Sequence, residues 1–156
     1  MKLARLMILL PIFLIILGCT SAVGETGGIE IENIWGRKAP KVAQNGAFYM
    51  SITNNSGEDD ELVGAQSEAC AVVELHEMYM MENDVMGMRQ VPGGTIPVPE
   101  GETVELKVGG LHVMCIDKQA AFEVGDEIPI TLDFANAGPM DLTVEIRESA
   151  MEGMDT

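Results

Sequence analysis

Short runs of alternating apolar and polar residues fill the chain from residue 29 to residue 147. Such alternation is typical of half-buried β-strands, and no stretch shows the 3.6-residue period of an amphipathic helix. Turn sequences such as Asn54-Asn55-Ser56-Gly57 and Gly109-Gly110 separate the runs. The pattern predicts nine strands, at residues 29–35, 47–54, 61–65, 71–81, 85–91, 103–108, 112–117, 128–134 and 142–147. We therefore expect an all-β chain, and strands of this length and spacing favour a Greek-key β-sandwich.

The first eighteen residues do not follow this pattern. Lys2 and Arg5 precede an unbroken apolar run at residues 6–17, and Gly18-Cys19 follows at once. The run is shorter than the roughly 20 residues that a bilayer-spanning helix needs. These features predict a signal peptide of the lipoprotein type at residues 1–18, with Cys19 as the lipid-bearing N-terminus of the mature protein. Secretion without an anchor, with cleavage after Ala22, is the alternative, and both place the protein outside the cytoplasm.

Composition divides the rest of the chain into three parts. Ser, Thr and Gly dominate residues 19–28, which predicts a flexible tether. Residues 29–147 have the size of one domain, and residues 148–156 form an acidic tail that contains methionine. The formal net charge of −16 repels phosphate backbones and anionic lipid headgroups. Nucleic acid is thereby excluded as a partner, and contact with a membrane would depend on the lipid anchor.

Candidate metal ligands gather in the middle of the chain. Both histidines belong to His-X-Met triplets, His76-Glu77-Met78 and His112-Val113-Met114, and Met88 lies between them. Strand residues two apart point to the same face, so each triplet directs an imidazole and a thioether to one side. Thioether sulfur is a soft ligand that selects Cu(I) over Mg²⁺, Ca²⁺ and Zn²⁺. The arrangement therefore predicts a surface site for Cu(I) with two histidine and two methionine ligands.

These residues resemble the periplasmic copper chaperones of the PCu(A)C family, which have the same order of His, Met and His-X-Met. The likeness extends through Ile34-Trp35, Asn45-Gly46-Ala47, Val73-Glu74-Leu75-His76-Glu77-Met78 and Met86-Gly87-Met88-Arg89. It implies a cupredoxin-like sandwich that holds one Cu(I) through His76, Met88, His112 and Met114. The chain has one extra residue before Met88 and two after it, so Met86 is a rival for Met88, and Met78 is a candidate auxiliary ligand. The family also implies delivery of copper to a membrane acceptor, the CuA centre of cytochrome c oxidase. We further expect a monomer, with a second copper chaperone as an additional partner.

Other interpretations of the chain remain. Cys70 and Cys115 form either a disulfide or free buried thiols, and strand parity places them on different faces unless a bulge intervenes. A blue-copper carrier is disfavoured because no histidine follows Cys115. No catalytic Ser-His-Asp order or nucleophile elbow is present, which predicts that the protein is not an enzyme. The alternative functions are a copper buffer and a lipid-anchored structural or adhesion sandwich that binds no metal.

Overall fold

The fold comes from a computed structural model that describes residues 25–26 and 28–148. Its strands are β1 (Glu25–Thr26), β2 (Ile29–Arg37), β3 (Gly46–Asn54), β4 (Asp60–Gln66), β5 (Cys70–Met80), β6 (Met86–Gln90), β7 (Ile96–Val98), β8 (Thr103–Leu106), β9 (Leu111–Lys118), β10 (Glu127–Phe134) and β11 (Gly138–Arg147). Two 3₁₀ turns, η1 (Glu82–Asp84) and η2 (Pro92–Gly94), lie on either side of β6. All nine predicted strands are present, and the all-β, cupredoxin-like fold is confirmed.

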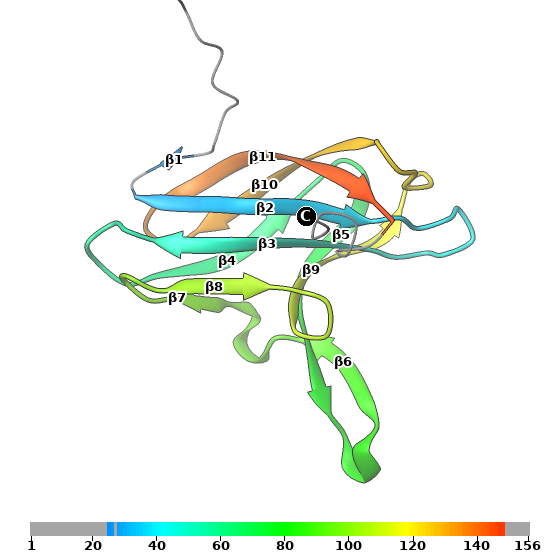
Figure 1. Ribbon diagram of the computed structural model, residues 1–156, viewed down its shortest axis with the longest axis horizontal. Helices are drawn as coiled ribbons and strands as arrows, with labels where there is room; N and C mark the ends of the chain where they lie inside the picture. Colours follow the sequence, from blue (N-terminus) through cyan, green and yellow to red (C-terminus); the bar gives the residue numbers. More distant parts are fainter. Residues whose placement is uncertain (1–24, 27, 149–156) are drawn as a thin grey trace, which may run out of the picture.

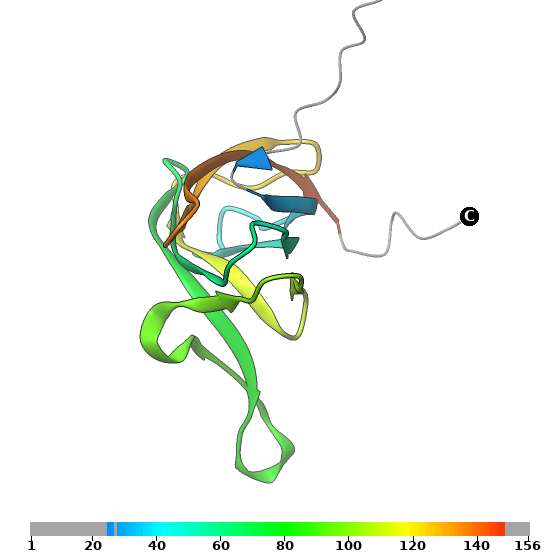
Figure 2. The same ribbon diagram turned by 90° about the vertical axis from the view of Figure 1, so that its left-hand side faces the viewer.

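The strands form one continuous sheet in the order β6-β5-β9-β8-β3-β2-β11-β10-β4-β7. The sheet curls so that strands from its two halves face each other across a shared core (Figures 1 and 2). Most neighbours are antiparallel, but β2 pairs in parallel with β11 and closes the link between the two halves. Strand β9 pairs with β5 along most of its length and with the start of β3 through its other edge. This position makes β9 the strand that joins the β5–β6 hairpin to the body.

Apolar residues from both halves of the sheet fill the interior. The largest fully buried side chains include Phe48 of β3 and Phe122, whose rings stack with centroids 5.7 Å apart. Gly46, at the start of β3, makes room for this packing. A Cβ on Gly46 would lie 2.5 Å from the Phe122 ring, so any larger residue there would displace the ring or the strand. The glycine therefore fixes how closely the start of β3 approaches the core.

Three short segments differ from the predicted elements. The expected loop after β6 contains β7, in which Pro97 pairs with Glu61 at the outer edge of the sheet. Proline is tolerated there because an edge strand has amide groups that need no ladder partner. Strand β1 extends sheet pairing into the predicted tether, where Glu25 lies opposite Glu30. The last predicted strand, 142–147, begins earlier in the structure, because β11 already starts at Gly138, which has a positive φ of 79°.

Several predictions concern segments at the two ends of the chain. The signal peptide, Cys19 and the tail after residue 148 lie outside the described residues. Glu148, the first residue of the predicted tail, is described and pairs with Lys38 at 3.3 Å. Within residues 25–26 and 28–148, the structure contains no helix with the length and apolar character needed to cross a membrane.

Candidate metal centre

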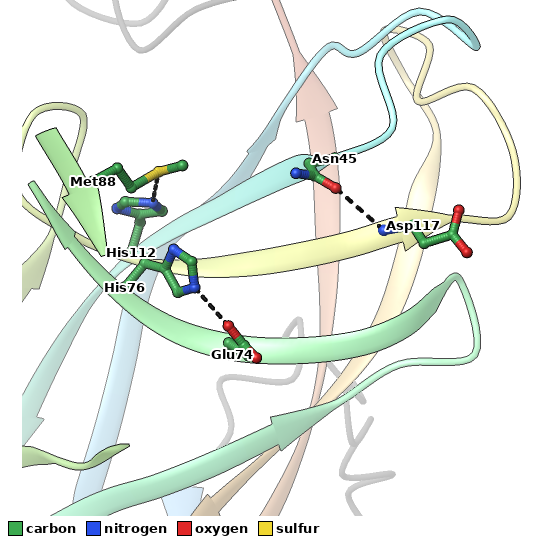
Figure 3. Close-up of polar contacts among 6 residues, drawn as sticks. All are labelled: Asn45, Glu74, His76, Met88, His112 and Asp117. Atoms are coloured by element: carbon green, nitrogen blue, oxygen red, sulfur yellow. Dashed lines mark hydrogen bonds and ion pairs between the residues drawn. The ribbon is translucent and has the colours of Figure 1, made fainter. Parts of the chain in front are cut away.

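The pairing of β5 with β9 brings the two histidines together. His76 lies directly opposite His112 in the antiparallel register, and Glu74 lies opposite Met114. Because residues two apart share a face, these four side chains form one patch on the same side of the two strands. The imidazole rings stand edge to face with their centroids 5.9 Å apart (Figure 3). The parity of each triplet is evident from the sequence, and the strand register brings the two triplets together into one site.

The β5–β6 hairpin adds the third predicted segment. Met88 lies opposite Met78, and its Sδ is 3.3 Å from Nε2 of His112 (Figure 3). Met86, the rival for this position, pairs with Met80 one step farther toward the hairpin tip. The structure therefore places Met88 and not Met86 beside His112. The gap between the predicted strands at 71–81 and 85–91 is occupied by η1 at the hairpin tip.

A backbone carbonyl sets the tautomer of His112. Its Nδ1 lies 3.0 Å from the carbonyl oxygen of Gly110. A carbonyl can only accept, so Nδ1 carries the proton and Nε2 presents its lone pair toward Met88. Burial lowers the pKa of His112, the hydrogen bond to Gly110 raises it in part, and a charge on His76 would lower it further. The ring is thus kept neutral and ready to bind a metal ion through Nε2.

Glu74 has the corresponding role at His76. Oε2 of Glu74 lies 2.8 Å from Nε2 of His76, and the carboxylate accepts this hydrogen bond (Figure 3). In the neutral ring the proton is then on Nε2, and the lone pair is on Nδ1. That Nδ1 is buried and has no hydrogen-bond partner. A buried polar atom of this kind is costly unless it has a partner, and a metal ion would provide one. Carboxylates commonly orient metal-binding histidines in this way.

The site opens into a pocket of about 390 Å³. Met78, Met88, His112 and Met114 line one side of it, and the segment from Arg37 to Ala47 lines the other. Among the described residues, no Asp or Glu lines this pocket, although the chain contains 25 of them. A larger hollow of about 980 Å³, bounded by parts of β4, β5, β10 and β11, has no histidine or methionine in its lining. Of these two hollows, only the smaller one combines methionine sulfur with imidazole in its described lining.

The ligand patch is more buried than the sequence suggested. His112 and Met114 are only 4% and 8% exposed, because Tyr49 packs beside His112 with ring centroids 6.2 Å apart. Trp35 stacks on Tyr49 at 4.5 Å and extends this aromatic cover. Burial raises the pKa of Tyr49 even though Arg37 lowers it, so the phenol stays protonated at neutral pH. Met88, by contrast, is 47% exposed. The predicted surface site thus combines a buried His112 and a half-buried His76 with an open edge at Met88.

A disulfide joins Cys70 to Cys115, with the two Cα atoms 5.3 Å apart. The objection from strand parity does not hold because the ladder is irregular there. The register between β5 and β9 omits Ala71 and Asp117, and Asp117 has a positive φ of 49°. Its N–H donates to Oδ1 of Asn45 at 3.2 Å, which holds the irregularity in place (Figure 3). The disulfide therefore cross-links the two strands that carry His76 and His112.

Two contributors to the site were missed in the sequence. Glu74 stands two residues before His76, so its parity already placed it on the ligand face, and this signal could have identified it. Tyr49 could not be found in this way, because its contact with His112 depends on the pairing of β3 with β9. No cluster of three or more His, Cys, Asp or Glu side chains suited to a metal ion occurs in the described part of the chain.

Comparison with known proteins gives the chain its relatives. The family described as "Putative lipoprotein LpqE-like" matches residues 29–146. A protein of Leifsonia xyli subsp. xyli (strain CTCB07) named "Putative lipoprotein Lxx21020" is 28% identical over 126 residues, which are 80% of this chain and 72% of that protein.

Solved structures share the fold. The apo PCuAC domain from PmoF1 has a TM-score of 0.67 at 24% identity, and the alignment covers 79% of this chain and 96% of that domain. The copper-bound PCuAC domain from PmoF2 has a TM-score of 0.64 at 24% identity, covering 79% and 95%. CuI-DR1885 from Deinococcus radiodurans has a TM-score of 0.58 at 25% identity, covering 77% and 78%.

These findings confirm the resemblance inferred from the sequence, and they agree with the prediction that the protein is not an enzyme. The matched range also coincides with the strands that carry the histidine and methionine patch. The chain therefore belongs to the LpqE-like family of lipoproteins and has the fold of PCuAC domains.

Proposed function

We propose that this protein is an extracytoplasmic Cu(I) chaperone. The observation that carries the proposal is a free imidazole lone pair beside a thioether, with a second unpartnered imidazole nitrogen on the neighbouring strand. Nε2 of His112 faces Sδ of Met88 at 3.3 Å, and the orphaned Nδ1 of His76 lies on the neighbouring strand. Met114, opposite Glu74 on the same face, is the fourth donor of the set. Two imidazoles with two thioethers suit a soft monovalent ion.

The surroundings of the patch support Cu(I) over harder cations. Mg²⁺ and Ca²⁺ require oxygen ligands, and the pocket has no carboxylate in its described lining. The basic residues Arg37 and Lys38 also line it, which further disfavours a divalent ion. Cu(I) is less affected, because its bonds to sulfur and nitrogen are more covalent and its charge is lower. Similarity to the copper-bound PCuAC domain from PmoF2 and to CuI-DR1885 agrees with this choice.

Release by ligand exchange follows from the same donor set. Thioethers bind Cu(I) more weakly than thiolates, so an acceptor with cysteine ligands can displace Met88 first and the histidines afterwards. Each step breaks one bond between copper and this protein and forms one Cu–S bond to the acceptor, whose thiol releases its proton to solvent. We propose the CuA centre of cytochrome c oxidase as the acceptor, following the family resemblance. A lipid on Cys19, which the lipoprotein names of the relatives support, would keep the chaperone at the membrane that holds the acceptor.

Anaerobic titration with Cu(I) tests the binding site. The wild type should take up one tight equivalent, and X-ray absorption should show both nitrogen and sulfur neighbours. His112→Ala should weaken binding at least tenfold, whereas the control Met140→Leu, at a buried core methionine of β11, should not. A spectrum with only nitrogen and oxygen neighbours, or an unchanged affinity in His112→Ala, would refute the site.

Transfer distinguishes a chaperone from a copper buffer. The Cu(I)-loaded protein is mixed with the apo soluble domain of the oxidase subunit that carries CuA, and copper is measured in each after separation. Copper that moves to the oxidase domain supports delivery. Copper that stays on this protein would refute delivery to CuA and leave a buffer as the function of the same site.

A further inference from the structure

The β5–β6 hairpin carries two cross-strand pairs of methionines on one face. Met78 lies opposite Met88, and Met80 lies opposite Met86. The hairpin projects from the body of the sheet (Figures 1 and 2), so the second pair is the farther from the core. All four residues have the parity of His76 and therefore share its face. The two pairs form a thioether ladder that runs from the hairpin tip to His112.

The opposite face of the same hairpin has a structural explanation. Glu77 and Arg89 form an ion pair at 2.8 Å, and the Arg89 guanidinium lies 4.3 Å from the centroid of the Tyr79 ring. The thioether of Met81 packs over Gly87, and its sulfur lies 2.7 Å from the position that a Cβ on Gly87 would occupy. Each side chain on this face thus has a partner that stabilises the hairpin.

The ladder face lacks such partners. Met80 is 60% exposed and Met86 is 47% exposed, so neither side chain buries much apolar surface. Other side chains would support a strand at these positions at least as well, because β-propensity reflects packing and burial, and these two side chains pack little. Clustered apolar residues on an exposed surface usually mark a binding function. What the four side chains share chemically is a soft sulfur atom.

We propose that Met80 and Met86 form a second, weaker Cu(I) site at which copper enters and leaves the chaperone. This inference rests on the proposed function and adds a route to its site. Two residues along a strand span about 6.8 Å, so the outer pair is about that distance from the inner pair of Met78 and Met88. Methionine has three rotatable side-chain bonds, which let sulfur atoms of neighbouring pairs reach toward each other.

Copper would move along the ladder by exchange between thioethers. Each step breaks one Cu–S bond and forms another, copper remains Cu(I), and no proton is released because a thioether has none. The outer site has only sulfur donors, while the inner one adds the imidazole of His112, which is the stronger ligand. The higher Cu(I) affinity of the inner site therefore directs copper inward. An acceptor that docks at the hairpin tip and binds Cu(I) more tightly than either site would draw the ion outward.

Titration of the full chain, labelled with ¹³C at the methionine methyl groups, tests the ladder. Cu(I) is added anaerobically to two equivalents, and Ag(I) serves as a redox-inert probe in a parallel series. The first equivalent should shift the methyl signals of Met88 and Met114. The second should shift those of Met80 and Met86, with an affinity at least tenfold weaker. Signals of Met80 and Met86 that do not respond to the second equivalent would overturn the proposal.

Matched variants identify the residues responsible. Met80→Leu combined with Met86→Leu should abolish the second equivalent and slow copper uptake from a chelated donor about tenfold. Met81→Leu is the control, because Met81 is 45% exposed, close to the 47% of Met86, but belongs to the opposite face of the hairpin, and it should retain both equivalents. A second equivalent that persists in the double variant would refute the ladder.

The same titrations distinguish a failure of the proposed function from a failure of the thioether ladder alone. If His112→Ala loses the first equivalent and the second is absent from the wild type, the tight site stands and the ladder is wrong. If His112→Ala retains the first equivalent, the proposed function is wrong, and a second equivalent lost in the Met80/Met86 variant would still support a thioether site on the hairpin.

Discussion

Replacement of Glu74 tests whether the carboxylate orients His76 for copper. Its hydrogen bond to Nε2 is 2.8 Å long and partly buried, with side-chain exposures of 12% for His76 and 32% for Glu74. A hydrogen bond to a charged group contributes about 1.5–3 kcal/mol and a neutral one about 0.5–1.5 kcal/mol. Glu74→Gln keeps an acceptor but loses the charge, so it should cost about 1 kcal/mol, or roughly fivefold in Cu(I) affinity. Glu74→Leu removes the acceptor and should cost between about tenfold and a hundredfold.

Competition against a chromogenic Cu(I) chelator at neutral pH measures these affinities, and thermal melting followed by circular dichroism confirms that each variant is folded. Glu77→Gln is the matched control. This residue belongs to the same strand, but its carboxylate pairs with Arg89 on the other face of the hairpin, so the affinity should stay within twofold of the wild type. The graded order of wild type, Gln and Leu is the signature of a positioning role. A folded Glu74→Leu variant with wild-type affinity would show that His76 binds copper without its carboxylate partner, or does not bind it at all.

Two further predictions concern protons and the disulfide. Because burial lowers the pKa of His112, its ring in the apo protein should titrate below the ordinary histidine value of about 6.5 in an NMR titration. Protons should then compete with copper for this ligand only below that pH. A midpoint at or above 6.5 would contradict the stated effect of burial. Replacing Cys70 and Cys115 together by alanine should lower the free energy of unfolding by up to about 4 kcal/mol, which is the loop-closure value for their separation of 45 residues. An unchanged denaturant midpoint would show that the cross-link does not stabilise the fold.

Strand positions were predictable because apolar and polar residues alternate along the sequence where one face of a strand is buried and the other is exposed. β11 shows this well, since buried and exposed residues alternate from Met140 to Arg147. What alternation cannot give is the register between strands. Placing His76 opposite His112 requires the pairing of β5 with β9, which are separated by the β6 hairpin and two further strands. The ligand set was therefore predictable by residue, and its geometry was not.

Local exceptions to the alternating pattern explain the remaining differences. β7 was missed because a proline at its centre is typical of a loop, and only the outer position of the strand makes Pro97 acceptable. The disulfide was left open because parity opposes it, and the irregularity at Asp117 is invisible in the sequence. Burial of His112 likewise depends on Tyr49, which reaches it across a pairing between distant strands.

The two sides of the patch are suited to different tasks. Both imidazoles are oriented by hydrogen bonds, His76 by Glu74 and His112 by the carbonyl of Gly110, so these donors lose little conformational entropy when they bind an ion. Met88 has no comparable restraint and stands at the open edge. A bound ion would therefore be anchored by nitrogen on the buried side and held loosely by sulfur on the exposed side. Exchange should begin where the weaker donor and the solvent coincide, which is also where the hairpin methionines lead away from the site.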